Sequence, residues 1–196
     1  CDRCVLRSSM SDQLSFLDRA PDPRHRYFFA ISVEPATGAR ITALGQELRR
    51  RHRLRGQPLL TERLHFTLHH LGDYDVEHNG IVDTARGAGA AVEAGCFTVE
   101  LDRAMDFGGM FVLTGRDGVT ELKGFQRMLG ESMALAGLGK HVQKNFTPHV
   151  TLFYGENGGG EIAVEPIRWI VREFVLIHSL LGETRHTALG RWDLRG

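Results

Sequence analysis

Cysteine is scarce in this chain of 196 residues, which holds only Cys1, Cys4 and Cys96. Such an odd, sparse count fits a reducing compartment, so we expect a cytoplasmic protein. Cys1 and Cys4 form a single Cys-x-x-Cys pair, with no second pair and no histidine nearby. Because a structural zinc ion needs four ligands, this pair by itself does not predict a zinc or redox site.

Long apolar runs and an excess of one charge are missing as well. No run approaches the ~18 apolar residues that a membrane span needs, so we expect no membrane partner. The first ten residues lack the apolar core of a secretory signal, and whether Met10 is a natural start is left open. The 24 basic residues balance the 24 acidic ones, which excludes a general nucleic-acid coat but allows a protein that grips only a few phosphates.

What the chain does contain is a short motif that occurs twice, as His65-Phe66-Thr67-Leu68 and as His149-Val150-Thr151-Leu152. With ten histidines and 42% hydrophobic residues, about 0.1 copies of such a tetrapeptide would be expected by chance. Each copy alternates polar and apolar residues, which is typical of a half-buried strand. The alternation predicts that each histidine and its threonine share one face, while the apolar pair anchors the strand in a core.

Periodicity, turn residues and helix-stop signals predict the elements around the two motifs. In chain order these are a strand over 26–33, a helix from about Pro35 to Arg53, the motif strand 64–71, a helix over about 76–92, strands over 96–104 and 109–114, a helix from Asp117 to Gly137 or Gly139, the second motif strand, and closing strands over 167–181 and 187–194. This order predicts an α+β protein with mostly antiparallel sheets and an internal structural duplication.

Three segments carry further expectations, besides the strands and helices predicted above. We expect residues 1–25 to be a flexible N-terminal segment and residues 26–196 to form a single domain. The basic run 49–53 has two possible roles. It can form a solvated last turn whose positive charges match the helix dipole, or it can steer phosphates toward a site. The glycine-rich loop 156–160 is expected to border the site.

Two His-x-Thr pairs that face each other suit the cleavage of a phosphodiester. Near pH 7, two imidazoles supply one proton acceptor and one proton donor. The threonine hydroxyls can donate to the non-bridging oxygens of a phosphate. Such a site needs no metal, no cofactor and no covalent intermediate. One histidine on a strand is more often structural than catalytic, so the functional interpretation depends on the second copy, and these residues alone do not say which histidine is acid and which is base.

The paired motifs resemble those of the 2H phosphoesterase superfamily, and within it the RNA 2′,3′-cyclic phosphodiesterases, also called 2′-5′ RNA ligases. The matching pieces occur in the family's order and cover about residues 26–194. They are Arg26-Tyr27-Phe28-Phe29-Ala30-Ile31, Leu64-His65-Phe66-Thr67-Leu68 with Leu71-Gly72, Phe146-Thr147-Pro148-His149-Val150-Thr151-Leu152, and the strand Phe174–Leu181 with Ser179.

The resemblance implies a bilobed fold with pseudo-two-fold symmetry and an active-site groove between the lobes. It implies that His149 is the general base, which activates water, and that His65 is the general acid, which protonates the departing 3′ oxygen. Thr67 and Thr151 would hold the phosphate. The expected partner is an RNA 3′ end or a cyclic nucleotide, bound by a monomer.

One position departs from the pattern, because Tyr154 stands where several family members have arginine. The loss of a guanidinium weakens phosphate clamping, although Tyr154 could stack on a base or simply pack. Simple alternation also places His69 on the face of His65, as an auxiliary groove residue or a surface one. His65 and His69 would lie about 13 Å apart in a strand, too far for one metal ion, so we expect no metal site there.

Three functions follow from these observations. The first is metal-independent hydrolysis of 2′,3′-cyclic phosphates to 2′-phosphates. The second is cleavage or joining of 2′-5′ linkages in the same groove. The third is a binding module for RNA ends or nucleotides that has lost turnover. This alternative is suggested by Tyr154, which stands where several family members have arginine.

Overall fold

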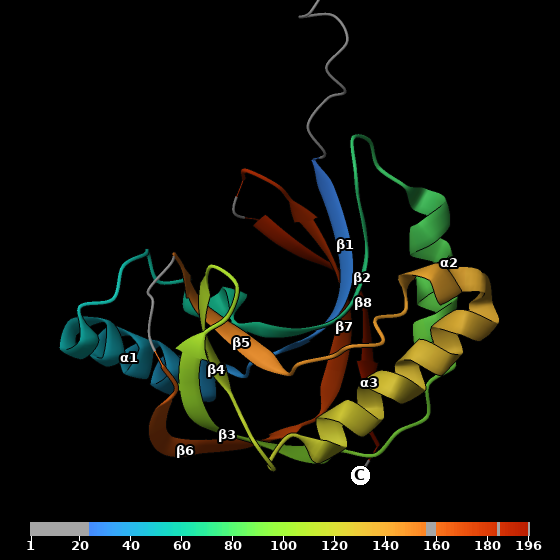
Figure 1. Ribbon diagram of the computed structural model, residues 1–196. Coiled ribbons are helices and arrows are strands. Elements are labelled where there is room, and N and C mark those ends of the chain that lie inside the picture. Colours follow the sequence, from blue (N-terminus) through green and yellow to red (C-terminus); the bar gives the residue numbers. More distant parts are fainter. Residues whose placement is uncertain (1–23, 156–159, 184, 196) are drawn as a thin grey trace, which may run out of the picture.

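The computed structural model describes residues 24–155, 160–183 and 185–195. Within these residues the chain forms three α-helices and eight strands (Figure 1). They are β1 (His25–Ser32), α1 (Pro35–His52), β2 (His65–Tyr74), α2 (Asn79–Ala90), β3 (Phe97–Asp106), β4 (Met110–Thr114), α3 (Thr120–Met133), β5 (His149–Tyr154), β6 (Ile162–Val171), β7 (Glu173–Leu180) and β8 (Arg185–Asp193). Most of the loop 156–160 and nearly all of the segment 1–25 lie outside the described residues, so those two expectations stay predictions.

The strands form two four-stranded antiparallel sheets. Sheet A has the order β2-β1-β7-β8, and sheet B has the order β5-β4-β3-β6. Each motif strand, β2 or β5, is therefore the edge strand of its own sheet. The edge position of β5 agrees with Pro148 directly before it, since proline cannot donate to a ladder. The predicted α+β class with antiparallel sheets is confirmed.

The same irregularity interrupts both motif strands. In sheet A, Ala30 pairs with Thr67 and Phe29 with His69, so the register skips Leu68. In sheet B, Val112 pairs with Thr151 and Phe111 with Phe153, so the register skips Leu152. Each skipped leucine is the extra residue of a β-bulge, and a bulge of one residue reverses which face the following side chains occupy.

The helices are divided between the two sheets. Helix α1 packs on sheet B, where Gly45 faces Leu152 of β5 and an added Cβ would lie in ordinary contact, 3.7 Å from that side chain. Helices α2 and α3 lie together on the side of sheet A (Figure 1), joined by the Ser132 hydroxyl, which donates to the Ala88 carbonyl at 2.7 Å. Helix α3 also contacts β3, with the ring of Phe125 packed 5.4 Å from that of Phe97, so this helix touches both sheets.

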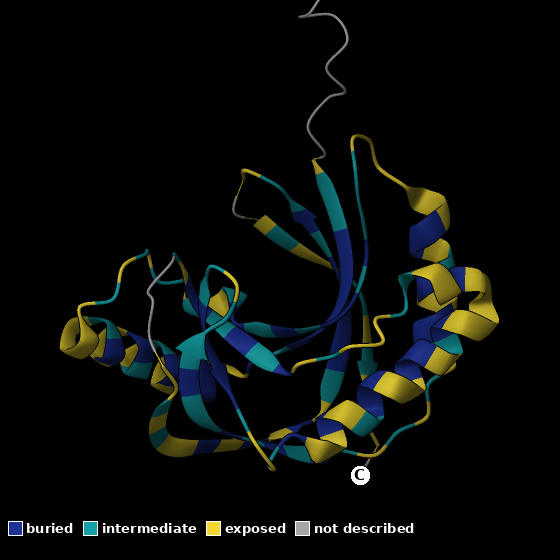
Figure 2. Ribbon diagram, in the orientation of Figure 1, coloured by how far each residue is buried: buried dark blue, intermediate teal, exposed yellow. Residues whose placement is uncertain are grey.

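Buried apolar residues of both sheets and all three helices form one continuous core, and Figure 2 shows these buried positions along the strands and helices. A second, small apolar cluster lies on the opposite face of sheet A and consists of Phe28, Ala30, Val175 and Ile177. Since strand residues alternate between faces, this small cluster identifies the side of sheet A that does not meet the main core. It forms part of the floor of the site described below.

The end of the chain differs from the prediction. The single strand expected over 167–181 is wrong, because the chain forms β6 in sheet B and β7 in sheet A, with a break at Arg172. Apolar residues continue on both sides of this arginine without glycine or proline, so the pattern carries no signal that the chain passes from one sheet to the other. None of the helices in the described part of the chain is long and apolar enough to cross a membrane.

Candidate active site

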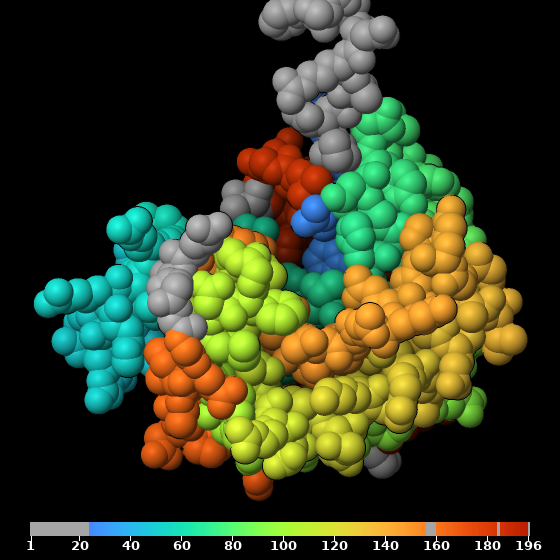
Figure 3. All heavy atoms as spheres, viewed as in Figure 1, coloured from blue at the N-terminus to red at the C-terminus, as the bar shows by residue number. Residues whose placement is uncertain are grey.

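A pocket of about 440 Å³ opens between the two sheets. Its wall comes from β1, β2, β7, β8, the segment before β2, and the end of β5. The lining residues are Arg26, Phe28, Leu59, Arg63, His65, Thr67, His70, Tyr154, Ser179, Leu181 and His186. In the space-filling view, this region is a hollow with β1, in blue, at its back (Figure 3). The pocket therefore gathers side chains from both halves of the chain.

His65 is fixed in this pocket through its backbone neighbour. Its Nδ1 lies 2.7 Å from the carbonyl oxygen of Arg63, which can only accept a hydrogen bond, so Nδ1 carries the proton. The ring also packs against Phe28, with 5.1 Å between ring centroids. Nε2 is then the atom that remains for chemistry. Burial is the main cause that lowers the pKa of His65, and the charges of Arg63 and His149 lower it further against the opposing effect of the Nδ1 bond.

His149 repeats this arrangement on β5. Its Nδ1 lies 2.7 Å from the carbonyl oxygen of Thr147, again two residues earlier, and its ring packs against Phe107 at 5.0 Å. In both imidazoles, Nδ1 is held by a backbone carbonyl and Nε2 is left for chemistry. They also interact, since the charge of His149 lowers the pKa of His65.

The predicted site residues are not all in the pocket wall. His65, Thr67 and Tyr154 line it, whereas His149 and Thr151 lie outside this wall on β5, the strand that carries Tyr154. Thr67 and Thr151 are both half-buried, and the hydroxyl of Thr151 lies 3.7 Å from the sulfur of Met110. Tyr154 is 59% exposed, so its ring is available to a ligand.

His69 is a correction to the sequence prediction. It is fully buried rather than in the groove or on the surface: its Nε2 lies 2.9 Å from the carbonyl of Gln126, and its Nδ1 accepts from the amide of Gln143 at 3.2 Å. Strict alternation placed His69 beside His65, but the bulge at Leu68 turns it into the core. The next residue, His70, occupies the pocket wall instead.

Two charged groups on sheet A hold the rim of the pocket. Arg26 donates to both oxygens of Asp73, at 2.7 and 2.6 Å, and Nε2 of His70 lies 2.8 Å from the same carboxylate. The hydrogen bond from Arg26 is the main cause that lowers the pKa of Asp73 to about 2. This network orders one wall, and it depends on the antiparallel pairing of β1 with β2, which sets Arg26 opposite Asp73.

Arg63 and His186 are site residues that the sequence analysis missed. The Nη2 of Arg63 lies 3.2 Å from Nε2 of His186, while its buried Nε has no hydrogen-bond partner among the described residues. The His186 ring lies 5.5 Å from that of His65. Burial is the main cause that lowers the pKa of His186 to about 4, with the charges of His65 and Arg63 adding to the effect. No local pattern marks His186, because β8 reaches the site only through the sheet order.

Comparisons with known proteins identify a family and similar folds. The family model described as the 2′-5′ RNA ligase superfamily matches residues 34–183. Among solved structures, E. coli LigT in its apo form is 26% identical, with a TM-score of 0.69 over 89% of this chain and 99% of that one. LigT complexed with 3′-AMP is 27% identical, with a TM-score of 0.65 over 89% and 99% of the two chains. A structure described as a phosphoesterase is 26% identical, with a TM-score of 0.66 over 89% and 100%.

No curated protein sequence matches the chain. The family model nevertheless covers well over half of it, and both His-x-Thr motifs fall within the matched residues. The chain therefore belongs to the 2′-5′ RNA ligase superfamily of 2H phosphoesterases.

Proposed function

We propose that the protein hydrolyses 2′,3′-cyclic phosphates, at RNA ends or on nucleotides, to 2′-phosphates without a metal ion in the reaction. The observation that carries the proposal is the matched support of the two motif histidines. In each, a backbone carbonyl two residues earlier holds Nδ1 at 2.7 Å. Two imidazoles that both present Nε2 are the acid and base that opening a cyclic phosphate requires.

The reaction needs one proton transfer at each histidine. Nε2 of His149 removes a proton from water as the water oxygen attacks phosphorus. The bond from phosphorus to the 3′ oxygen breaks, and Nε2 of His65, in its protonated form, donates to that oxygen. The 2′-phosphate remains, with His149 protonated and His65 neutral. His149 then releases its proton to solvent and His65 takes one up, which restores the starting state.

Hydroxyls and one guanidinium would hold the phosphate. Thr67 and Thr151 each follow a motif histidine by two residues and offer a donor to a non-bridging oxygen. Arg63 adds a donor, because its buried Nε has no hydrogen-bond partner in the described part of the chain. This arginine would supply the positive charge that the family's pattern has at the position of Tyr154.

Tyr154 would contact the nucleoside. Its exposed ring lines the pocket opposite the motif strand of sheet A, and a base stacked on an aromatic ring gains ~1–3 kcal/mol. LigT, a structural neighbour, has been solved with 3′-AMP, which supports a nucleotide as the ligand.

Product analysis tests the proposal directly. A 2′,3′-cyclic nucleotide is incubated with the protein in excess EDTA, and the products are separated as 2′- and 3′-phosphates. We expect turnover in EDTA with the 2′-phosphate as the product. Absence of turnover, or a 3′-phosphate product, would contradict the proposal.

A sulfur substrate assigns the acid. When sulfur replaces the 3′ bridging oxygen, the leaving thiolate needs little protonation. We expect His65→Ala to lose much less activity on this substrate than on the oxygen substrate, while the loss in His149→Ala stays the same. The opposite pattern would exchange the two roles.

The description of the family model favours a second candidate, cleavage or joining of 2′-5′ linkages in the same pocket. Incubation with 2′-5′-linked oligonucleotides, alone or with a 2′,3′-cyclic end and a free 5′ hydroxyl, separates this activity from ring opening. If the protein binds a 2′-nucleotide saturably but turns over none of these substrates, its function is that of a binding module for RNA ends or nucleotides.

A further inference from the structure

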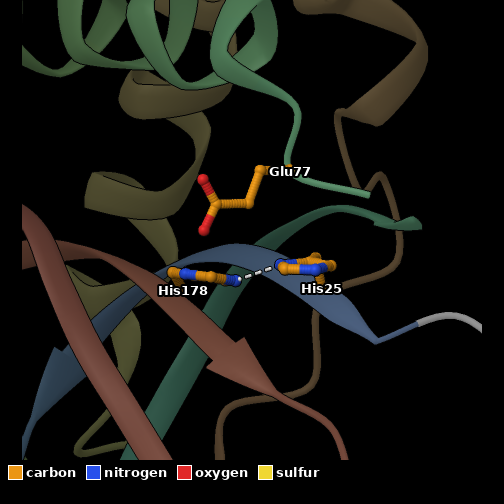
Figure 4. Close-up of side chains that lie close together, drawn as sticks. All are labelled: His25, Glu77 and His178. Carbon is orange, nitrogen blue, oxygen red and sulfur yellow. Dashed lines mark hydrogen bonds between the residues drawn. The ribbon is translucent and has the colours of Figure 1, made fainter. Parts of the chain in front are cut away.

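The face of sheet A that points away from the pocket carries a second group of ligating side chains. His25 begins β1, His178 lies near the end of β7, and Glu77 lies between β2 and α2 (Figure 4). Their neighbours Arg26 and Ser179 line the pocket, so alternation places His25 and His178 on the opposite face. This group is separate from the proposed active site.

The three side chains are close enough to share one ion. Nδ1 of His25 lies 2.9 Å from Nε2 of His178, and the ligand atoms of the two histidines and Glu77 all lie within 4.8 Å of one another. In Figure 4 the carboxylate of Glu77 projects toward the pair of imidazoles. In the described part of the chain, no other group of three His, Cys, Asp or Glu side chains meets this distance.

The pair of imidazoles is held in place from one side. The rings of His25 and His178 are nearly parallel, with 5.0 Å between their centroids, and the buried ring of Tyr27 stacks on His178 at 4.7 Å. The amide of His78 donates to the hydroxyl of Tyr27 at 3.3 Å, which ties the loop that carries Glu77 to the same spot. The ligand set is therefore positioned by strand pairing and by one aromatic side chain, not by chance proximity on a surface.

We propose that His25, Glu77 and His178 bind a divalent transition metal ion of the zinc type. Two imidazoles with one carboxylate form a known zinc ligand set, in which water takes the fourth position, whereas Mg²⁺ and Ca²⁺ prefer oxygen ligands only. The site would tie the connection between β2 and α2 to sheet A, behind the pocket.

The geometry needs only small movements to receive the ion. Two nitrogens at ~2.0–2.1 Å from a tetrahedral ion lie about 3.3 Å apart, so the histidine nitrogens would separate by a few tenths of an ångström. Glu77 is exposed, and its carboxylate already projects toward the two rings. In the hydrogen bond between the two rings, one of the two nitrogens donates its proton and the other accepts. When a metal ion replaces this proton, the donor ring carries its proton on its other nitrogen instead.

Calorimetric titration of Zn²⁺ into the full chain, first freed of metal with a chelator, tests the site. We expect one ion per chain with micromolar or tighter affinity, weakened at least ~10-fold in Glu77→Gln and ~100-fold in His25→Ala. His52→Ala, which removes an exposed histidine from α1, should bind like the unaltered chain. Saturation should raise the melting temperature by roughly 5–10 °C at a hundredfold excess over Kd, and Mg²⁺ should not compete.

Two further variants exclude other ligands. Co²⁺ in place of Zn²⁺ should give visible bands without the near-ultraviolet absorption of a thiolate complex, so Cys1 and Cys4 are not the ligands. His65→Ala should keep the affinity, so the ion is not in the active site. Circular dichroism checks that Glu77→Gln, a surface change, leaves the fold intact. Equal affinity in Glu77→Gln, His25→Ala and the unaltered chain, or no binding at all, would overturn the proposal.

Discussion

Leu68 and Leu152 are equivalent residues, because each is the extra residue of a β-bulge three positions after a motif histidine. The bulges bury the residue that follows each leucine, which is His69 in β2 and Phe153 in β5. The next residues, His70 and Tyr154, then return to the pocket face, and both line the pocket. The pseudo-symmetry of the protein thus extends two residues beyond the repeated tetrapeptide, into positions where the sequences of the two halves differ.

The first prediction concerns the exposed ring at the end of β5. Tyr154→Ala should weaken binding of a 2′-nucleotide by ~1–3 kcal/mol, since it removes a stacking surface, while Tyr154→Phe should change it little. Tyr154→Arg should strengthen the binding of inorganic phosphate, because it adds a guanidinium at the rim. Calorimetry measures both ligands, with Ile170→Ala, an exposed apolar residue of β6, as the control. Unchanged nucleotide affinity in Tyr154→Ala would show that this ring only packs.

Arg63 provides the second prediction. Arg63→Gln keeps the backbone carbonyl that supports His65 but removes the charge, so we expect kcat/KM on a cyclic nucleotide to fall ~10–100-fold. Arg63→Lys should recover part of this loss, because it restores the charge without the planar donors. Arg40→Gln, an exposed change on α1, is the matched control for the loss of one positive charge. If Arg63→Gln and Arg40→Gln behave alike, the guanidinium of Arg63 does not hold the phosphate.

The third prediction concerns the titration of His65. Because its folded pKa lies below 6.5, we expect the ring to be mostly neutral at pH 7 in the free protein. A bound phosphate anion favours the protonated ring, so a saturating 2′-nucleotide should raise this pKa. NMR titration of the ring carbon signals, assigned with His65→Ala, measures both states. A pKa that stays the same on binding would place the phosphate elsewhere.

The same shifts predict how stability depends on pH. His65 and His186 both have folded pKa values below the unfolded value of 6.5, that of His186 being about 4. Below pH 6.5 the unfolded chain binds protons that the folded chain does not, so their contribution to the free energy of unfolding is complete above pH 6.5 and is lost as the pH falls toward 4. Urea unfolding at pH 7 and pH 5 should therefore show a larger difference in the unaltered chain than in His186→Leu. An equal difference in both chains would refute a half-buried, neutral His186.

His69 gives a prediction of stability without a loss of chemistry. His69→Ala leaves a cavity and removes the partner of the buried Gln126 carbonyl, so the free energy of unfolding should fall by ~2–4 kcal/mol. Below the melting temperature, kcat/KM should stay within a few-fold of the unaltered chain. Urea unfolding and a cyclic-nucleotide assay check the two parts. A large loss of turnover in a folded variant would return His69 to the active site.

Much of the fold could be predicted because local patterns and tertiary structure agree. The apolar run over 26–33, the alternation in 64–71 and the apolar stripe after Pro35 correspond to β1, β2 and α1, with ends that differ by one to three residues. The pairing of the two motifs was predictable because a rare tetrapeptide occurs twice. These signals lie in consecutive residues.

What the sequence could not show depends on pairing between distant strands. The bulge at Leu68 is a property of the register between β1 and β2, so strict alternation placed His69 on the wrong face. The break at Arg172 depends on which sheet each segment joins, and the position of His186 beside His65 depends on β8 lying next to β7. No neighbouring residue carries a signal for any of the three.

The central claim is that His65 and His149 act together on one phosphate. Single-turnover hydrolysis of a 2′,3′-cyclic nucleotide by His65→Ala, His149→Ala and the double variant measures this directly, with His52→Ala as the control. We predict a loss of ~10²–10⁴-fold in each single variant and at most about tenfold more in the double variant, because the two residues form one unit. Either single variant keeping its rate within tenfold of the unaltered chain would contradict the claim.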